Sequence, residues 1–209
     1  MTSPAIHGLY VITRDDLPTA ALLADMDAAL QGGAAVIQYR NKQRDKSLRY
    51  KQATMLRQLC RRHGVPFIVN DDIALAREVD ADGVHLGRDD DNLTRARHIL
   101  GDDAIIGASC YDSLPLARAA AAGGADYVAF GSFFASPTKP QAVTATSGLL
   151  QQAANTLNIP IVAIGGITPL NGAALIHAGA HALAVISGLY TKHGVEHTAR
   201  QYVRLFEHP

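Results

Sequence analysis

The sequence has few cysteines, no tryptophan, no net charge and no long apolar run. Only Cys60 and Cys110 occur among the 209 residues, so neither a disulfide framework nor a cysteine-based metal site is predicted. Lys plus Arg and Asp plus Glu number 19 each, which gives a formal net charge of zero. Because nucleic-acid and membrane-surface binding need a basic excess, this balance argues against both partners. No apolar stretch approaches the length that crosses a bilayer.

The first residues, Met1 to Gly8, lack the basic and apolar segments of a signal peptide. With so few cysteines, we expect a reduced, cytoplasmic setting. Hydrophobic residues make up 48% of the chain and charged residues 18%, which is an ordinary globular balance. The length fits a single domain over residues 1–209 with a substantial core. The sequence leaves the oligomeric state open, and a homodimer is possible.

Short apolar runs alternate with helical segments such as Ser47–Arg62 and Leu114–Ala122. The runs carry continuous Val, Ile and Ala, as expected of parallel strands that are covered on both faces. Eight such units predict a single-domain (β/α)8 TIM barrel. A doubly wound sheet is the alternative, although no G-x-G-x-x-G follows the first strand. The predicted strands are Leu9–Ile12, Ala35–Tyr39, Phe67–Val69, Val84–Leu86, Ile105–Ala108, Tyr127–Phe130, Ile161–Ile164 and Leu183–Ile186.

Glycine recurs just before the even-numbered strands, as in Gly32-Gly33, Gly83, Gly123-Gly124 and Gly179. Glycine after a helix supplies a left-handed cap and permits a tight turn into the next strand. The spacing of these glycines supports two βα units per interval. The longest connection, Ser132–Thr146, is predicted to be an active-site lid.

Polar residues gather where the predicted strands end, which is where barrel enzymes place their active sites. This clustering predicts one site at the carboxyl ends of the strands. The polar segments are Gln38–Lys42, Asn70–Asp72, His85–Asp90, Ser109, Ser136–Lys139, Gly165-Gly166 and Ser187-Gly188.

Gln38, Arg40 and Lys42 alternate at period two, so in an extended chain their side chains point the same way. Two cations and an amide make a good grip for a diphosphate, although ordinary surface charges at a strand end would look the same. Tyr39 and His85 either line a pocket for a ring or belong to the core.

Asp71 and Asp90 follow neighbouring strands, and two carboxylates there suit Mg²⁺ that bridges diphosphate oxygens. The alternative is that either one caps the next helix, a role that Asp72 and Asp91 are also placed to take. Near the seventh and eighth strands, Gly165-Gly166 and Ser187-Gly188 favour a phosphate site over a purely geometric turn.

Together these patterns suggest transfer of a group with diphosphate as the leaving group. Covalent catalysis is not required, because the sequence shows no Ser-His-Asp or Cys-His arrangement. The sequence closely resembles the thiamine phosphate synthase family over nearly its whole length. The matching segments are Gln38–Lys42, Val69–Asp72, Gly83–Gly87, Ile106–Ser109, Phe130–Lys139, Ala163–Ile167 and Val185–Ser187.

The resemblance implies a transferase of thiamine biosynthesis that joins 4-amino-2-methyl-5-hydroxymethylpyrimidine diphosphate to a thiazole phosphate. Diphosphate leaves first in this family, and Mg²⁺ bound by Asp71 and Asp90 assists its departure. The implied catalytic residues are Arg40, Lys42, Ser109 and Lys139. The implied substrate-binding residues are Gln38, Tyr39, Arg40, Asn41, Lys42, Asn70, Ser109, Ser136, Pro137, Thr138, Lys139, Gly166, Ile186 and Ser187.

The sequence departs from the family pattern at Arg88-Asp89-Asp90 and at Ala135-Ser136-Pro137. The role of Arg88 is open, and Phe133-Phe134 either shields the site or packs beneath it. Two other functions compete: a thiazole tautomerase that needs no diphosphate substrate, and a catalytically silent sensor of thiamine precursors. Retention of Arg40, Lys42 and Lys139 favours the synthase, because a tautomerase has no need of a diphosphate cage.

Overall fold

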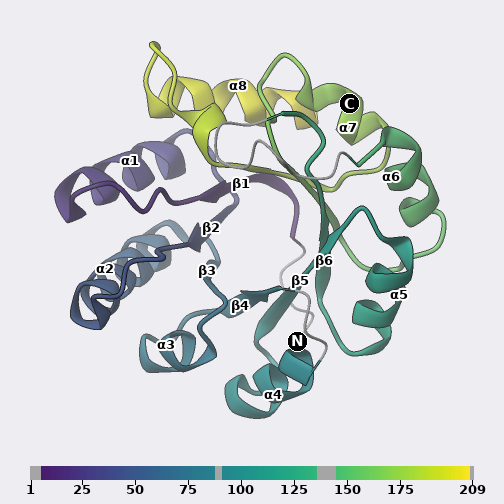
Figure 1. The fold of residues 1–209 in the computed structure, drawn as a ribbon. Coiled ribbons are helices and arrows are strands. Elements are labelled where there is room, and N and C mark those ends of the chain that lie inside the picture. Colours follow the sequence, from purple (N-terminus) through teal and green to yellow (C-terminus); the bar gives the residue numbers. More distant parts are fainter. Residues whose placement is uncertain (1–5, 88–90, 136–144, 208–209) are drawn as a thin grey trace.

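The computed structural model describes residues 6–87, 91–135 and 145–207, with only the backbone at residues 91 and 92. Parallel strands close into a barrel in which sequence neighbours pair and β8 returns to β1 (Figure 1). The strands are β1 Gly8–Ile12, β2 Val36–Tyr39, β3 Phe67–Asn70, β4 Gly83–Leu86, β5 Ile105–Tyr111, β6 Tyr127–Phe130, β7 Ile161–Ile164 and β8 Ala182–Val185. This topology confirms the predicted (β/α)8 barrel and excludes the doubly wound sheet.

Helices surround the barrel, each following the strand of the same number (Figure 1). They are α1 Thr19–Gln31, α2 Lys46–His63, α3 Ile73–Glu78, α4 Asp91–Leu100, α5 Leu114–Ala122, α6 Ser147–Ala154, α7 Gly172–His177 and α8 Val195–Glu207, and a 3-10 turn, η1 Ser187–Leu189, follows β8.

Several helices begin with the same capping arrangement. The side chains of Asp45, Asp72, Ser113 and Thr146 each accept a hydrogen bond from the backbone N–H three residues later, which in every case belongs to a leucine. Such a cap satisfies an N–H that the helix itself cannot use. The caps therefore fix where each helix starts after its βα loop.

The strands divide their side chains between two cores. On β1, Leu9 and Val11 pack outward against the helices, whereas Tyr10 and Ile12 point into the barrel. Alternation of this kind follows from the period of two along a strand. Because both faces are buried, the strand sequence reads as one apolar run. The inner core therefore admits only a few side chains, and these form the floor of the site.

The strand bounds agree with the prediction for β6 and β7 and differ most for β5. That strand continues to Tyr111 instead of ending at Ala108, and its pairing with β6 shifts register between Ser109 and Tyr111. Ser109, predicted to end the strand, therefore lies within it. The local irregularity lengthens the strand in a way that residue type alone does not signal.

The glycine signals have two physical causes, not one. Gly33, Gly124 and Gly179 take positive φ of 94°, 89° and 110°, as the left-handed turn requires. Gly83 instead lies within β4, where a Cβ would come 1.9 Å from the carbonyl oxygen of Ile105. The prediction of a turn glycine is wrong there, because close packing between strands demands it.

Two partly buried carboxylates, Asp82 and Asp126, tie the amino-terminal end of the barrel together. Asp82 accepts from the backbone N–H of Phe67 at 2.7 Å and from Arg57 at 3.1 Å. Asp126 likewise lies 2.7 Å from an Arg97 nitrogen. These ion pairs join α2 and α4 to the strands at the end remote from the polar strand ends, so their role is structural.

Cys60 and Cys110 are both buried, and they form no disulfide with each other. Burial raises the pKa of the Cys60 thiol to about 12, so this thiol is unreactive at neutral pH. Among the described helices, none has the length and apolarity needed to span a bilayer.

Candidate active site

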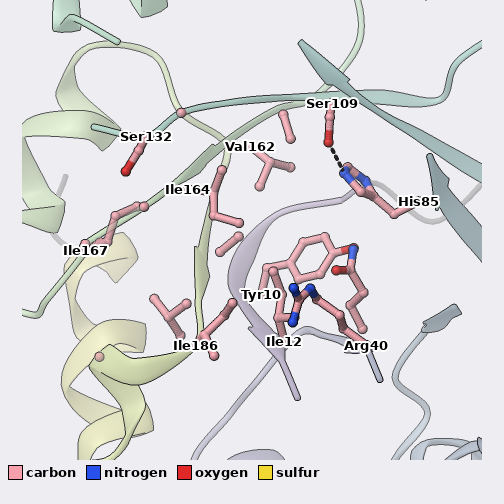
Figure 2. A pocket seen from close by; sticks show the side chains of 18 of the residues that line it. Tyr10, Ile12, Arg40, His85, Ser109, Ser132, Val162, Ile164, Ile167 and Ile186 are labelled. Atoms are coloured by element: carbon pink, nitrogen blue, oxygen red, sulfur yellow. Dashed lines mark hydrogen bonds between the residues drawn. The ribbon is translucent and has the colours of Figure 1, made fainter. Parts of the chain in front are cut away.

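A cavity of about 440 Å³ opens among the carboxyl ends of the strands (Figure 2). Its walls combine polar groups from β2 to β5 with apolar and glycine residues from β6 to β8. The lining residues are Tyr10, Ile12, Gln38, Arg40, Asn70, His85, Ser109, Tyr111, Tyr127, Ala129, Gly131, Ser132, Val162, Ile164, Gly165, Gly166, Ile167, Ala184, Val185, Ile186, Ser187 and Gly188.

The two kinds of wall face each other across the cavity. Figure 2 shows Ile164 and Ile186 on one side and His85 and Arg40 on the other. A mostly apolar pocket with a few convergent polar groups is the usual form of a small-molecule site. Such a lining would orient a planar ring with its faces against aliphatic carbon and its edge toward the polar groups.

A chain of hydrogen bonds crosses the floor of the cavity and joins five strands. The Gln38 amide nitrogen donates to the Tyr10 hydroxyl at 2.9 Å, and this hydroxyl lies 2.7 Å from that of Tyr127. The Tyr127 hydroxyl lies 2.9 Å from His85 Nδ1. His85 Nε2 in turn lies 2.9 Å from Ser109 Oγ (Figure 2). We call these five residues the floor relay.

Burial keeps every member of the floor relay uncharged near neutral pH. It lowers the pKa of His85 to about 4, so the imidazole is neutral. It also raises the pKa of Tyr10 and of Tyr127 well above the usual value for tyrosine. The floor of the cavity therefore offers hydrogen bonds without charge.

Space for the relay comes from a missing side chain on β5. A Cβ at Gly107 would lie 2.0 Å from Cζ of Tyr127, so only glycine leaves room for that ring. The Tyr127 ring then stacks on His85 with 5.5 Å between ring centroids. Gly107 belongs to the segment Ile106–Ser109 that resembles the family, and its role is to leave room for the Tyr127 ring.

An open groove of about 600 Å³ lies beside the cavity, over β2 to β4, and Asn70 lines both. Cationic, amide and carboxylate side chains meet there. The groove is lined by Asn41, Lys42, Gln43, Arg49, Asn70, Asp71, Asp72, Ile73, Ala74 and Arg95.

Asp71 and Asp72 have separate tasks. Asp72 caps α3 through the backbone N–H of Leu75 at 3.0 Å and pairs with Arg49 at 2.6 Å. Within the described residues, the Asp71 carboxylate has no such partner. Asp71 also adopts φ 61°, which is uncommon for a residue with a side chain and concentrates at functional positions. The capping alternative therefore applies to Asp72 and leaves Asp71 for the groove.

The donors in the groove suit a hard divalent cation. Mg²⁺ binds through one or two carboxylates plus substrate phosphates and waters, so it does not need a dense protein cage. Asp71 supplies one carboxylate beside Asn70. No group of three or more His, Cys, Asp or Glu side chains arranged for a metal occurs among the described residues. One carboxylate beside an amide is a donor set that suits Mg²⁺.

Gln38, Arg40 and Lys42 do not all face the same space, although the sequence predicted that they would. Gln38 and Arg40 line the cavity, whereas Lys42 lines the groove. Strand β2 ends at Tyr39, so strict alternation does not continue to Lys42. The backbone N–H of Arg40 donates to Thr13 Oγ1 at 2.9 Å, which fixes the chain where it leaves the strand.

Tyr39 and Asn41, both implied by the resemblance to bind substrate, lie in different surroundings from each other. The Tyr39 hydroxyl donates to Gln52 of α2 at 2.8 Å, and its ring belongs to the outer core. The structure therefore does not bring Tyr39 to the cavity or to the groove. Asn41 lies in the groove and donates to the same Gln52 oxygen at 3.0 Å.

The loop after β7 is built on two glycines with positive φ, 107° at Gly165 and 62° at Gly166. A Cβ on Gly165 would lie 2.0 Å from Ser132 Oγ, and one on Gly166 would lie 2.6 Å from the carbonyl oxygen of Ala135. Asn171 holds the loop by donating to the Gly166 carbonyl at 3.1 Å. The glycines are needed for geometry and also leave backbone exposed to the cavity.

Ile186 and Ser187 line the same side of the cavity as Gly166. Ser187 begins the turn η1, and the following Gly188 would place a Cβ 2.3 Å from the carbonyl oxygen of Ile167. The loops after β7 and β8 therefore lie against each other.

Phe133 is buried in the outer core and Phe134 packs against that core. Neither lines the cavity, so the packing interpretation holds for both rings. Six residues of interest lie outside the described residues: Arg88, Asp90, Ser136, Pro137, Thr138 and Lys139. The predicted lid is described only at residues 132–135 and 145–146.

Sequence reasoning missed Tyr10, Tyr127 and Tyr111 as lining residues. Tyr10 and Tyr127 occupy inward positions of β1 and β6, within runs that read as ordinary core. A tyrosine at an inward strand position, with a hydroxyl that burial obliges to find a partner, was the available signal.

The fold and the candidate site together indicate the class of protein. This is a (β/α)8-barrel enzyme with an apolar cavity and a charged groove at the carboxyl ends of its strands. Residues 9–189 match the family described as thiamine monophosphate synthase. The chain belongs to that family and is a transferase.

Relatives and a solved structure agree with this assignment. The chain is 55% identical to a thiamine-phosphate synthase of Thiobacillus denitrificans, covering 95% of this chain and 94% of the relative. It is 53% identical to one from Methylobacillus flagellatus, covering 97% of each chain. The structure of a thiamine phosphate pyrophosphorylase from Pyrococcus furiosus superposes with a TM-score of 0.84 at 35% identity, covering 96% of this chain and 95% of that one.

Proposed function

We propose that this transferase condenses 4-amino-2-methyl-5-hydroxymethylpyrimidine diphosphate with a thiazole phosphate. The products are thiamine phosphate and diphosphate. The observation that carries the proposal is the junction of the apolar cavity with the cationic groove at Asn70. A flat, uncharged ring joined to a diphosphate would place its ring in the first and its anion in the second.

The groove side is the proposed diphosphate site. Lys42 lines the groove, and Arg40 stands at the polar wall of the cavity beside it. Their charges would neutralise the leaving group as negative charge grows on it. The residues proposed to hold the pyrimidine diphosphate are Gln38, Arg40, Asn41, Lys42, Asn70, Ser109 and Lys139.

We propose Mg²⁺ as the cofactor, held by Asp71 and, from outside the described residues, Asp90. When bound, Mg²⁺ would polarise diphosphate oxygens and make the diphosphate a better leaving group. The Asp71 carboxylate supports this role because it lies in the groove and Asp72 already caps the helix.

The loops after β7 and β8 are the proposed site of the thiazole phosphate. Gly166 and Ser187 line the cavity opposite the polar wall, where a phosphate can approach the backbone closely. The proposed set is Ser136, Pro137, Thr138, Gly166, Ile186 and Ser187.

In the proposed dissociative reaction, the C–O bond between the pyrimidine methylene and the diphosphate breaks first, and its electron pair leaves with the diphosphate. The aminopyrimidine stabilises the resulting carbocation. The thiazole nitrogen then donates its lone pair to form the new C–N bond. Arg40 and Lys42 would bind the departing anion, and the apolar wall at Ile164 and Ile186 would exclude water from the cation.

No protein nucleophile is required by this scheme. The polar residues on the described floor of the cavity are hydroxyls, an amide and a neutral imidazole. A cytoplasmic location and a homodimer are further proposals from the sequence.

The test is diphosphate release by the purified protein with the pyrimidine diphosphate, the thiazole phosphate and Mg²⁺, each omitted in turn. Release that needs all three, with thiamine phosphate as product, is the expected result. Conversion of a thiazole phosphate isomer without the pyrimidine substrate would instead identify a tautomerase. Binding of both precursors without turnover would identify a sensor.

A further inference from the structure

Each group in the floor relay can be counted as a donor or an acceptor, and the count fixes a direction. Gln38 presents its amide nitrogen, which only donates, to the Tyr10 hydroxyl. Tyr10 is fully buried, so its own proton must find an acceptor in the relay. The available oxygen is that of Tyr127, 2.7 Å away.

The remaining links then follow one by one. Tyr127 has accepted from Tyr10, so its hydroxyl donates to His85 Nδ1 at 2.9 Å. A neutral imidazole carries one N–H, which must therefore be on Nε2. That N–H donates to Ser109 Oγ at 2.9 Å. In this order every donor has one acceptor.

The opposite direction leaves a donor without a partner. If Ser109 donated to His85 Nε2, His85 would donate from Nδ1 to Tyr127 and Tyr127 to Tyr10. The Tyr10 proton would then face only the donating amide of Gln38. An unsatisfied hydroxyl at a fully buried position is costly, so this order is disfavoured.

We propose that the floor relay is a directed chain that makes Ser109 a hydrogen-bond donor toward the cavity, with Tyr10, Tyr127 and His85 as positioning residues. Ser109 lines the cavity, and among the described residues the one partner of its hydroxyl is His85. Its hydroxyl proton is thus free for a ligand. The matching ligand atom is an acceptor, such as an unprotonated ring nitrogen of the aminopyrimidine.

Burial agrees with this order. His85 is buried, and each of its ring nitrogens has one partner within the relay, the Tyr127 hydroxyl at Nδ1 and the Ser109 hydroxyl at Nε2. The arrangement also explains why β5 carries Gly107, since a side chain there would displace the Tyr127 hydroxyl from the relay. The ligand part of the inference rests on the proposed function, whereas the direction of the relay does not.

The first test needs no substrate and reads the direction of the relay in the parent protein. Protein labelled with ¹⁵N-histidine and free of ligand is examined near pH 7 by long-range ¹H–¹⁵N correlation, and the His85 signals are identified by their loss in His85→Gln. The expected tautomer has its proton on Nε2 and an unprotonated Nδ1. A proton on Nδ1, or an even mixture of tautomers, would overturn the directed relay even if the protein were an active synthase.

The second test measures coupling to Ser109. Tyr127→Phe removes the donor to Nδ1 and is expected to lower kcat/KM for the pyrimidine diphosphate about tenfold, with KM for the thiazole phosphate unchanged. In a Ser109→Ala background the same substitution should cost little more, because the hydroxyl to be oriented is gone. Tyr10→Phe, one step further away, should show a smaller loss, about threefold, with the same dependence on Ser109.

Thr198→Val is the matched control, since it removes a buried hydroxyl from α8, outside the relay. It is expected to leave both kinetic constants and the His85 tautomer unchanged. Equal losses for Tyr127→Phe with and without Ser109 would show a purely structural role for the tyrosines and contradict the positioning role. Absence of synthase activity in the parent protein would refute the proposed function while the tautomer still decides the relay.

Discussion

On the β2–β4 side of the barrel mouth the groove is lined by ionisable side chains, including Lys42, Arg49 and Asp71. On the β7–β8 side the cavity lining between residues 162 and 188 consists of glycine, serine and aliphatic residues. The first side therefore depends on charge, and the second depends on where the backbone runs. Both sides would meet phosphorylated molecules, yet they should respond to different perturbations.

This difference would let one barrel bind two different anions at separate places. A charged groove attracts a diphosphate with its metal, whereas a glycine loop admits a monophosphate by leaving space and backbone N–H groups. Changes of side chain, salt and pH should therefore act mainly on the β2–β4 side. Added carbon atoms should act mainly on the β7–β8 side.

The largest expected effect comes from Asp71→Asn, which removes the carboxylate while asparagine still tolerates the positive φ of 61°. Turnover should fall about a hundredfold or more, because a charge-stabilising metal contact is lost. The measurement is the rate of diphosphate release as Mg²⁺ is varied.

Asp80→Asn is its control, since Asp80 also has a positive φ, 53°, but lies at the turn before β4 on the far end of the barrel. It should retain activity. An Asp71→Asn enzyme as active as the Asp80→Asn enzyme would contradict the metal assignment.

The second prediction concerns how pH changes the stability of the protein through His85 of β4. His85 has a folded pKa of about 4, and an unfolded histidine titrates near pH 6.5. Because the folded value is the lower one, stability is fully present above about pH 6.5 and is lost as pH falls toward 4. Between pH 7 and pH 4.5 this group should account for a loss of about 2 kcal/mol in the free energy of unfolding.

Urea unfolding of the parent and of His85→Gln at the two pH values measures this loss. The variant should lose about 2 kcal/mol less between pH 7 and pH 4.5 than the parent does. Equal losses in the two proteins would mean that His85 is not held neutral by burial.

The third prediction tests the backbone side. Gly166→Ala would place a Cβ 2.6 Å from the carbonyl oxygen of Ala135 at a φ of 62°. KM for the thiazole phosphate should rise about tenfold as the loop shifts, and KM for the pyrimidine diphosphate should stay near its original value.

Gly64→Ala has nearly the same φ, 66°, but nothing lies within 4 Å of the added Cβ. It isolates the cost of the conformation, about 1 kcal/mol of stability, from the cost of the contact. If the Gly64 variant raised KM for the thiazole phosphate as much as the Gly166 variant, the loop would have no special part in binding.

The smallest expected effect comes from salt. Raising the ionic strength from about 0.05 M to about 0.5 M shortens the screening length several-fold. KM for the pyrimidine diphosphate should rise by about threefold, and KM for the thiazole phosphate should rise less, because fewer full charges face it. Steady-state kinetics with sodium chloride at fixed Mg²⁺ measures both constants. A steeper response of the thiazole phosphate would reverse the comparison.

The fold was predictable because continuous apolar runs and turn glycines are local signals. The prediction located β6 at Tyr127–Phe130 and β7 at Ile161–Ile164, with the bounds observed. It ended β5 too early, because the register shift near Ser109 depends on pairing with β6. Gly83 was misread for a related reason, since close approach of Ile105 from another strand is not a local property.

The site was predictable where polar residues interrupt apolar strands, as at Gln38 and Asp71. It was not predictable where chemistry resides within the apolar runs. Tyr10 and Tyr127 are 117 residues apart in sequence, and only closure of the barrel joins their hydroxyls. Tyr39 was left open between pocket and core, and the structure places it in the outer core, because one step along β2 turns a side chain to the other face.

The proposed function places two phosphorylated substrates on separate sides of the barrel mouth. The most direct test is calorimetric binding of each substrate alone to Asp71→Asn and to Gly166→Ala, with Mg²⁺ present. In the expected result, Asp71→Asn weakens binding of the pyrimidine diphosphate alone, and Gly166→Ala weakens binding of the thiazole phosphate alone. Weakening of both ligands by each variant, or of the wrong ligand by either, would contradict it.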